Sequence, residues 1–514
     1  MTDAIVLAIV APFVLAALTL IAGLRFDESG WSVALLASVL EVGLTGYVLY
    51  VVTQNGRTPY VLAGFEPPSG IGLVADGFSA MVALLVAVVS LAVVIYARRA
   101  GPRGNTFYTV YLLLVGGLAG LAYTGDLFNM YVFLEIVGLT AYALVATGDS
   151  TRSVLAGLKY LIIGTLGASL FLLGVGYAYL ATGTLNMVDL ASRLGTEVAP
   201  YDSRLVLASF GLIVTGLTVK VALFPMHTWQ PEAYAEAPDS VSMFISALVS
   251  TVSAYALARV LFTVFTLDFF TVVPIARELI TYAAAVSIVA GSVLAVMQSD
   301  IKRMLAYSSV SQFGMIVAAF GLMNETAAIG GTIHLLGHAI IKGALFGATG
   351  IVVAVTGART VDEYAGLSQR APVTAGAFAV LALSMVGVPP AVGFVGKWYI
   401  AVGAVESGVW PVAAVIFVST VLTLAYFARV IERMYFAPAI PEEDLETEQD
   451  SPTDTASTAV TDGGDTAETE PTRPVSPGMV LVVVAATVTA VALGFLGSEI
   501  EQLLDPLLAE VFRQ

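Results

Sequence analysis

Long apolar runs dominate this chain and constrain its fold more than any other feature. About 14 runs reach roughly 18 residues or more, the length at which a helix can cross the hydrocarbon core of a membrane. Only 12% of the 514 residues are charged, whereas a soluble domain carries about 25%. The mean hydropathy is +0.89. The sequence therefore predicts an all-α polytopic membrane protein with about 14 transmembrane helices.

The predicted spans follow one another with short polar connections. No basic residue precedes the first apolar run, so this run is not predicted to be a cleaved signal. After the last span, residues 499–512 form an amphipathic pattern that we expect to lie at the membrane interface. The spans are expected at residues 4–23, 31–52, 73–97, 107–123, 127–146, 154–181, 205–230, 241–265, 271–297, 304–323, 327–355, 373–405, 409–435 and 478–495.

Charge and cysteine content exclude several classes of function. The chain has no cysteine, which excludes disulfides, cysteine-ligated iron–sulfur clusters and c-type haem attachment within it. A net charge of -16 argues against a nucleic-acid partner. Residues 441–471 hold 11 carboxylates and no Lys or Arg, and this segment is predicted to be a disordered linker. The acidic, lysine-poor composition resembles that of proteins from salt-loving archaea.

Basic residues in the connections predict the orientation of the chain in the membrane. The connections after odd-numbered spans hold 11 Lys or Arg residues, and those on the other side hold about five. Loops rich in Lys and Arg face the cytoplasm. We therefore expect both termini to lie outside the cell membrane and the acidic linker to lie inside.

Lysine is scarce, and its placement is informative. The chain has five lysines, four of which fall inside apolar spans. Arg stays protonated at any useful pH, whereas a buried Lys can lose its proton. This distribution indicates that the membrane interior needs a titratable cation. The lysines inside spans are Lys159, Lys220, Lys342 and Lys397.

Two spans contain helix-breaking residues beside one of these lysines. The seventh span contains Pro225 near Lys220, and the twelfth contains Pro389-Pro390 near Lys397. Because the two spans lie five apart, they run in opposite directions. Broken helices at matching positions of two inverted halves indicate a transport site. Ordinary proline kinks are the alternative.

Four charges are expected near the middle of the membrane: Glu135, Lys220, Lys342 and Lys397. Each costs about 2.5–3.5 kcal/mol on insertion scales, so the four cost roughly 10–14 kcal/mol. Pairing or water must offset this cost, and Glu135 with Lys220 is the expected pair of opposite charges. A salt bridge that only locks two helices is the alternative. Lys159 lies nearer the end of its span and is expected to snorkel to the cytoplasmic face.

The three histidines are candidates for proton transfer. His334, His338 and Lys342 are spaced four residues apart and share one helix face. Imidazole titrates near pH ~6.5, which suits a proton relay, and structural hydrogen bonding is the main alternative. A zinc site is disfavoured because the glutamate of a metalloprotease motif is absent. His227 either controls proton uptake from the cytoplasm or anchors the interface together with Trp229.

These residues match a known family. Residues 124–135, Thr-Gly-Asp-Leu-Phe-Asn-Met-Tyr-Val-Phe-Leu-Glu, resemble the fifth-helix signature of the D subunit of Mrp-type multisubunit cation/proton antiporters. Residues 298–312 resemble the tenth-helix signature of the wider family. That family includes the antiporter-like membrane subunits of respiratory complex I and of membrane-bound hydrogenases. Residues 181–186, 334–346 and 387–397 also match, and the resemblance is densest over residues 70–435.

The resemblance implies a fold of 14 helices with two inverted five-helix repeats. It divides the chain into an N-terminal three-helix segment (1–106), a first repeat of helices 4–8 (107–265), a second repeat of helices 9–13 (271–436), the acidic linker (441–471), and the last helix with the amphipathic helix (478–514).

The resemblance also implies roles for individual residues. Glu135, Lys220, His334, His338, Lys342 and Lys397 would transfer protons. The family carries a lysine on the eighth helix, and this chain has Thr251 at that position. The hydroxyls of Ser250, Thr251 and Ser253 could order a water wire, but they cannot hold a charge.

The sequence thus predicts a proton-translocating subunit of a sodium or other cation/proton antiporter, which exchanges external protons for cytoplasmic cations. Its expected partners are other subunits of a membrane complex, lipid, protons, and sodium or potassium. No cofactor, metal or catalytic chemistry is predicted for the chain itself. The alternative is a proton-pumping subunit of complex I or a membrane-bound hydrogenase, with the redox chemistry on a partner. A second alternative, suggested by Thr251, is an assembly subunit without transport.

Overall fold

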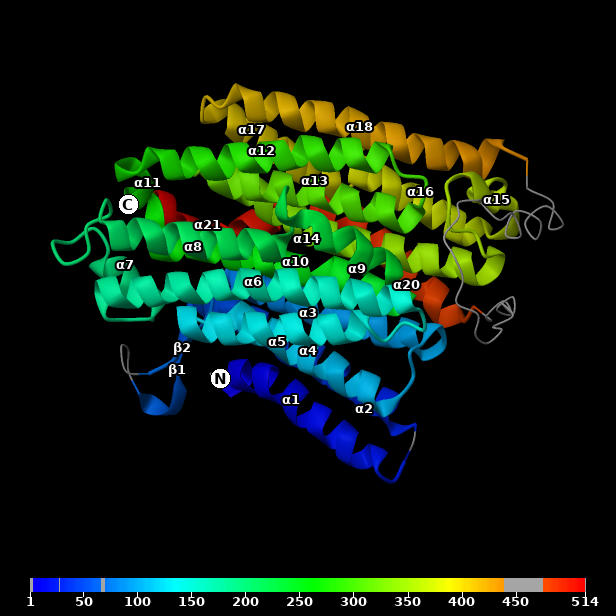
Figure 1. Cartoon of the computed structure of the whole chain (residues 1–514), viewed down its shortest axis with the longest axis horizontal. Coiled ribbons are helices and arrows are strands. Elements are labelled where there is room, and N and C mark those ends of the chain that lie inside the picture. Colours follow the sequence, from blue (N-terminus) through cyan, green and yellow to red (C-terminus); the bar gives the residue numbers. More distant parts are fainter. Residues whose placement is uncertain (1–2, 27, 66–69, 439–474, 514) are drawn as a thin grey trace, which may run out of the picture.

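The computed structural model describes residues 3–26, 28–65, 70–438 and 475–513. Most of these residues form helices that run roughly parallel in one bundle (Figure 1). Among them, 13 helices are long and apolar enough to cross a membrane by length and composition. The remaining predicted span is the twelfth, which is divided into two helices of 15 residues each. The prediction of a polytopic helical membrane protein is confirmed.

The helices and strands are named in chain order. They are α1 (Asp3–Gly23), α2 (Ser29–Asn55), β1 (Thr58–Val61), β2 (Gly72–Ala75), α3 (Gly77–Ala100), α4 (Asn105–Tyr123), α5 (Leu127–Val145), α6 (Thr151–Thr182), α7 (Met187–Arg193), α8 (Arg204–Val221), α9 (Gln230–Glu236), α10 (Asp239–Val260), α11 (Thr266–Val272), α12 (Pro274–Val296), α13 (Ile301–Gly321), α14 (Glu325–Thr356), α15 (Leu367–Arg370), α16 (Pro372–Val386), α17 (Val392–Glu406), α18 (Trp410–Phe436), α20 (Pro477–Ala492) and α21 (Gly497–Phe512).

Polar caps set where many of the helices begin. The side chains of Asp126, Ser150 and Asn324 each accept a hydrogen bond from a backbone N–H in the first turn of α5, α6 and α14. Such caps satisfy donors that have no partner within the helix. Polar residues in the short connections therefore also determine the residue at which each of these helices begins.

The seventh and twelfth spans are both broken, as the prolines predict. α8 ends at Val221, where Ala222 adopts a left-handed conformation with φ 65°, and the chain resumes as a helix at Met226. α16 ends at Val386 and α17 begins at Val392. Lys220 precedes its break, whereas Lys397 follows its break. The division into two inverted repeats stays a prediction.

The start of the third span differs from the prediction. The apolar run predicts a helix from residue 73, but Gly72–Ala75 forms β2, which pairs antiparallel with β1. The helix begins only after Asp76, whose side chain accepts a hydrogen bond from the backbone N–H of Ser79 at 2.9 Å. A short apolar run does not distinguish a strand from a helix by its pattern alone.

Both ends of the described chain lie at the same end of the bundle. Figure 1 places the N- and C-terminal ends at the end of the bundle that also holds β1, β2, α7 and α11. α21 packs against α3, α11 and α14 and buries Ile500, Leu504 and Leu508. The segment predicted as an amphipathic helix is helical, and its place at the membrane interface stays a prediction. The predicted linker 441–471 lies outside the described residues.

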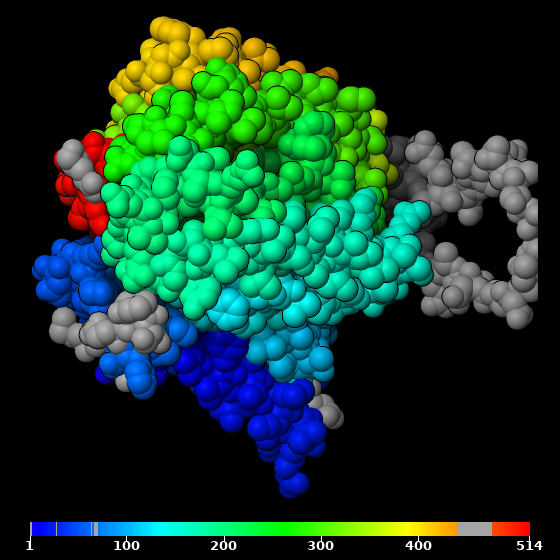
Figure 2. Space-filling view, turned by 60° about the vertical axis from the view of Figure 1, so that its left-hand side comes forward, coloured from blue at the N-terminus to red at the C-terminus, as the bar shows by residue number. Residues whose placement is uncertain are grey.

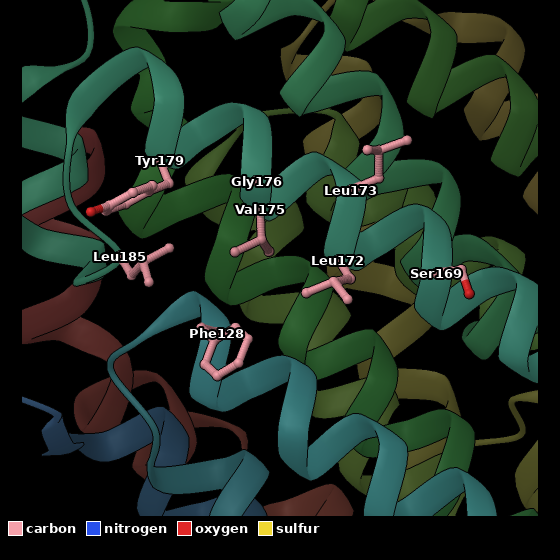
Figure 3. Close-up of a pocket in the computed structure, with 8 residues that line it drawn as sticks. All are labelled: Phe128, Ser169, Leu172, Leu173, Val175, Gly176, Tyr179 and Leu185. Atoms are coloured by element: carbon pink, nitrogen blue, oxygen red, sulfur yellow. The ribbon is translucent and has the colours of Figure 1, made fainter.

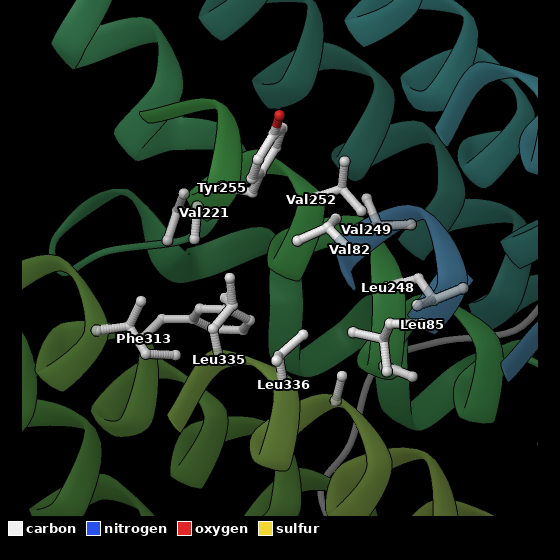
Figure 4. Packing of buried hydrophobic residues seen from close by; sticks show 14 of the residues in the cluster. Val82, Leu85, Val221, Leu248, Val249, Val252, Tyr255, Phe313, Leu335 and Leu336 are labelled. Atoms are coloured by element: carbon white, nitrogen blue, oxygen red, sulfur yellow. The ribbon is translucent and has the colours of Figure 1, made fainter. Parts of the chain in front are cut away.

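The bundle has two lateral edges and a buried centre. α1 and α2 project at one edge, and α18 lies at the opposite edge (Figures 1 and 2). α10 is buried along its length and packs against α14. Apolar side chains such as Val252, Leu335 and Phe313 fill the space between these central helices (Figure 4). The predicted site residues lie on α5, α8, α10, α14 and α17, except His227, which lies in the short helix Met226–Trp229.

Candidate functional site

The expected pair of Glu135 and Lys220 forms inside the bundle. Lys220 Nζ lies 4.0 Å from Glu135 Oε2, and the two side chains are 5% and 21% exposed, respectively. The lysine makes a closer contact with Tyr142, to whose hydroxyl it donates a hydrogen bond of 3.1 Å. Glu135 Oε2 is buried and has no hydrogen-bond partner among the described residues. Lys220 therefore has two competing partners, and the neutral one is nearer.

Tyr142 was not predicted as a site residue. Its hydroxyl fits between two glycines: a Cβ atom added at Gly164 would lie 1.9 Å from it, and one added at Gly138 would lie 2.8 Å from it. The Tyr142 ring packs edge-on against Tyr160 at 4.4 Å between centroids. Tyrosines are common in apolar spans, so its position in the sequence gave no signal. The glycines on α5 and α6 were the only hint of close packing there.

The break after α8 is held by side chains from the following segment. Trp229 Nε1 donates a hydrogen bond of 3.0 Å to the carbonyl of Val219. Gln230 Nε2 donates to Ser250 Oγ at 3.2 Å, and this hydroxyl donates to the carbonyl of Lys220 at 3.5 Å. The backbone that carries Lys220 is thus tied to α10 and to the helix beyond the break.

The three hydroxyls predicted as a water wire are all buried on α10, with different partners. Ser253 Oγ donates to the carbonyl of Val249 on its own helix at 2.8 Å. Thr251 Oγ1 has no hydrogen-bond partner among the described residues. Ser250 is engaged at the α8 break. The site thus brings one free hydroxyl, not a row of three, to the centre of the bundle, and the water wire stays a prediction.

On α14 the predicted row of basic residues is fully buried. Lys342 Nζ donates to the carbonyl of Leu305 at 2.8 Å and to Ser308 Oγ at 2.7 Å. His334 Nε2 lies 2.9 Å from Gln312 Oε1. Neither ring nitrogen of His338 has a hydrogen-bond partner among the described residues, and its ring packs against Phe313. His334 and Lys342 thus contact neutral groups of α13, whereas His338 contacts an aromatic ring of the same helix.

Lys397 is held at the break of the twelfth span. Its Nζ donates to the carbonyls of Met385 at 2.8 Å and Val386 at 3.0 Å, which are the last residues of α16. The adjacent Gly396 allows α17 to lie directly on α14, since a Cβ atom there would lie 2.7 Å from His334 Cβ. Similar close contacts at Gly330 and Gly403 extend this packing. Lys397 and His334 are therefore neighbours.

The remaining predicted residues lie near the first break. His227 is 6% exposed, its Nδ1 has no hydrogen-bond partner among the described residues, and its ring stacks on Phe224. Lys159 is 39% exposed, which fits snorkelling, but it also forms an ion pair of 2.9 Å with Glu232. Glu232 was not predicted as its partner, because it lies 73 residues further along the chain.

Two further buried sites with ionisable side chains were missed from the sequence. Arg259 donates two hydrogen bonds to the carboxylate of Asp76, at 2.6 and 2.8 Å, and both side chains are less than 10% exposed. Glu41 on α2 is 1% exposed. Glu41 stands near the middle of an apolar run, the same signal that identified Glu135. The apolar run that contains Glu41 has no lysine that would indicate a partner for the carboxylate.

A groove elsewhere on the molecule is separate from these charges. It has a volume of about 630 Å³ and lies between α5, α6 and the segment after α6. Figure 3 shows Phe128, Leu172 and Tyr179 among its mainly apolar lining. None of the charged residues described above lines it. Among the described residues, no group of three or more His, Cys, Asp or Glu side chains is placed to hold a metal ion.

The bundle has two broken spans, each with a lysine beside its break. This architecture is typical of polytopic transport subunits of membranes. The chain belongs to the NADH:quinone oxidoreductase/Mrp antiporter transmembrane family, which matches residues 124–423.

Two curated relatives and one solved structure illustrate the range of this family. The chain is 43% identical to the N subunit of the NADH-quinone oxidoreductase of Desulforudis audaxviator, over 81% of this chain and 83% of the relative. It is 33% identical to the D subunit of the Na(+)/H(+) antiporter of Bacillus subtilis, over 77% and 79%. It also resembles a chain of an archaeal membrane-bound sulfane sulfur reductase complex, with a TM-score of 0.86, 28% identity, and 99% and 98% coverage.

Proposed function

We propose that the chain is the proton-translocating subunit of a multisubunit cation/proton antiporter of the cell membrane. The observation that carries the proposal is the arrangement of Lys220 between a carboxylate 4.0 Å away and a tyrosine hydroxyl 3.1 Å away, inside a broken helix. A lysine with one charged and one neutral partner has two ways of being stabilised. Its proton can therefore be held or released as the carboxylate changes state.

In this proposal the proton path runs from Glu135 and Lys220 on α5 and α8 to His334, His338 and Lys342 on α14, and ends at Lys397 on α17. His227 and the ion pair of Lys159 with Glu232 lie at the cytoplasmic side of the first break. With both termini outside, external protons enter in exchange for cytoplasmic sodium or potassium. The membrane potential supplies about 2.3 kcal/mol per charge per 100 mV.

The second candidate is a proton-pumping subunit of a respiratory complex. The 43% identity to a subunit named for NADH-quinone oxidoreductase favours it, while the match to a sodium/proton antiporter subunit favours the first. The buried residues would act in the same way in both. In the second candidate, electron transfer on a partner subunit replaces the cation gradient as the driving force.

One experiment separates the candidates. The complex that contains this chain is prepared in everted membrane vesicles, and internal pH is followed with a fluorescent amine. A pH change on adding sodium or potassium salt, without an electron donor, supports the antiporter. A pH change that requires an electron donor and does not respond to either cation supports the respiratory complex. An assembled complex with neither response indicates a subunit without transport.

A further inference from the structure

Glu41 is a buried carboxyl group that the proposed proton path does not use. It lies near the middle of α2, its side chain is 1% exposed, and neither carboxyl oxygen has a hydrogen-bond partner among the described residues. No cation of the described residues forms an ion pair with it. Its position is outside the part of the chain that matches the family, residues 124–423.

The helices that pack against α2 are α1, α3 and α4, and their charged groups are engaged elsewhere or lie at the helix ends. α1 contributes only Asp3, at its first residue. On α3, Arg98 lies over the ring of Trp31 at 4.2 Å and Arg99 is in the last turn. Asp76, before α3, is bound by Arg259. The other titratable groups of these elements are tyrosines: Tyr96, Tyr108, Tyr111 and Tyr123.

Hydroxyl groups lie on the side of α2 that faces the bundle. Tyr123 is the last residue of α4, which packs against α2, and its hydroxyl is buried without a hydrogen-bond partner among the described residues. One helical turn before Glu41, the buried Ser38 hydroxyl donates to the carbonyl of Ala34 at 2.8 Å, and on α4 the Tyr111 hydroxyl donates to the carbonyl of Ser90 at 2.5 Å. Glu41 is thus surrounded by neutral polar groups and apolar side chains.

An ionised carboxylate in such a place would be isolated from water and from any counter-ion, which is very unfavourable. A protonated carboxyl carries no charge and gains an O–H donor. We infer that Glu41 is a second proton-binding site in the membrane interior, separate from Glu135. The site holds its proton on the carboxyl and exchanges it past the Tyr123 hydroxyl.

The direction of exchange follows from the neighbours of Tyr123. The carbonyl of Ala122 accepts a hydrogen bond of 2.7 Å from Tyr255, whose hydroxyl in turn accepts from Arg259 at 2.9 Å. Arg259 binds Asp76, directly before α3 and after β2. These contacts start at the backbone next to Tyr123, and they place polar groups between the last turn of α4 and the end of the bundle that holds the β1–β2 hairpin, so we expect exchange toward that end. The inference concerns a bound proton and does not depend on the proposed antiport.

Infrared spectroscopy of the purified complex tests this inference, because a protonated carboxyl has a C=O stretching band that a carboxylate lacks. We expect a band in the wild type that is lost in Glu41→Gln and shifted in Glu41→Asp, which keeps the carboxyl. Glu28→Gln, an exposed glutamate just before α2, is the matched control and should leave the band unchanged. Glu135→Gln identifies any contribution from the other carboxyl.

The exchange of the proton is tested with the same band. We expect it to shift in D2O or to disappear as the pH is raised, and either response supports an exchangeable proton. Tyr123→Phe should leave the band in place and slow its shift in D2O. Identical spectra for wild type and Glu41→Gln would overturn the inference, since Glu41 would then be ionised throughout. A Glu41 band that responds to neither D2O nor pH would also overturn it, since the carboxyl would then only be structural.

Discussion

The two halves of the proposed proton path surround their lysines with different chemistry. In the first half, Lys220 lies beside a carboxylate and a tyrosine hydroxyl. In the second half, Lys342 and Lys397 donate only to backbone carbonyls and to a serine hydroxyl. Among the described residues, no carboxylate forms an ion pair with either of them.

This difference suggests how each half changes its charge. Lys220 is stabilised as a cation by Glu135, so its state depends on a partner that can itself take up a proton. Lys342 and Lys397 each donate two hydrogen bonds, which a neutral amine can make as well as an ammonium group. They can therefore lose a proton without losing their contacts. In the first half, the protonation of Lys220 can respond to the charge of Glu135. In the second half, Lys342 and Lys397 are suited to transferring protons.

Removing the one carboxylate of the first half should have the largest effect. We expect Glu135→Ala to reduce cation-dependent proton flux in vesicles by about 100-fold or more, because the acid–base partner of Lys220 is lost. The complex should remain assembled. Glu197→Ala, in an exposed loop, is the control and should be neutral. Wild-type flux in an assembled Glu135→Ala complex would show that the two halves do not differ in the way described.

Changing the central lysine of the second half should be nearly as severe. Lys342→Ala removes the lysine that lies between Lys220 and Lys397 on the proposed path, so we expect flux to fall by at least about tenfold. Lys342→Arg separates the two explanations, because arginine keeps the charge but cannot release a proton. Flux should stay low in Lys342→Arg if titration matters. Normal transport by the assembled Lys342→Ala complex would assign Lys342 a purely structural role.

Tyr142→Phe tests whether the tyrosine hydroxyl takes part in the first half of the path. Without the hydroxyl, Lys220 keeps only the more distant Glu135 as a partner. Loss of a hydrogen bond to a charged group costs about 1.5–3 kcal/mol, so we expect flux to fall by about tenfold, the lower end of the corresponding range. Tyr179→Phe, on the exposed side of α6, is the matched control. An unchanged flux in Tyr142→Phe would remove the tyrosine from the switch.

The smallest effect is expected at Thr251, between the two halves. Its hydroxyl has no partner among the described residues, and a hydroxyl cannot carry charge near neutral pH. Thr251→Ala should lower flux by about threefold or less, because the substitution breaks no hydrogen bond to another described residue. Thr251→Val keeps nearly the same side-chain volume without the hydroxyl and should behave alike. A severe loss in both variants would mean that the centre depends on this hydroxyl.

Much of the architecture could be predicted because membrane spans obey a simple length rule. The apolar runs located the helices, and Pro225 and Pro389-Pro390 located the two breaks. The β1–β2 hairpin could not be predicted in this way, since Leu73 and Val74 continue the apolar run of α3. The strand is set by pairing with Thr58–Val61, which the apolar pattern does not show, and the helix begins only after the local cap at Asp76.

The charged site residues could be predicted because each of them raises the free energy of inserting its own apolar span into the membrane. Glu135, Lys220, Lys342 and Lys397 stood out because a charge in an apolar span needs a reason. Their partners did not, since Tyr142 is ordinary in such a span and Glu232 lies in a polar connection. The carbonyls that accept from Lys397 have no signature in the sequence. These contacts depend on the packing of helices that are distant in the chain.

The glycine contacts between α14 and α17 have a mechanical consequence. At Gly330, Gly396 and Gly403 the two backbones touch, so neither helix can slide along the other without collision. We expect α14 and α17 to move as one rigid unit, so that His334 and Lys397 keep their relative positions. Flexibility is expected in residues Gly387 to Ala391, which separate α16 from α17. We therefore expect any rearrangement of this half to appear as a hinge motion of α16.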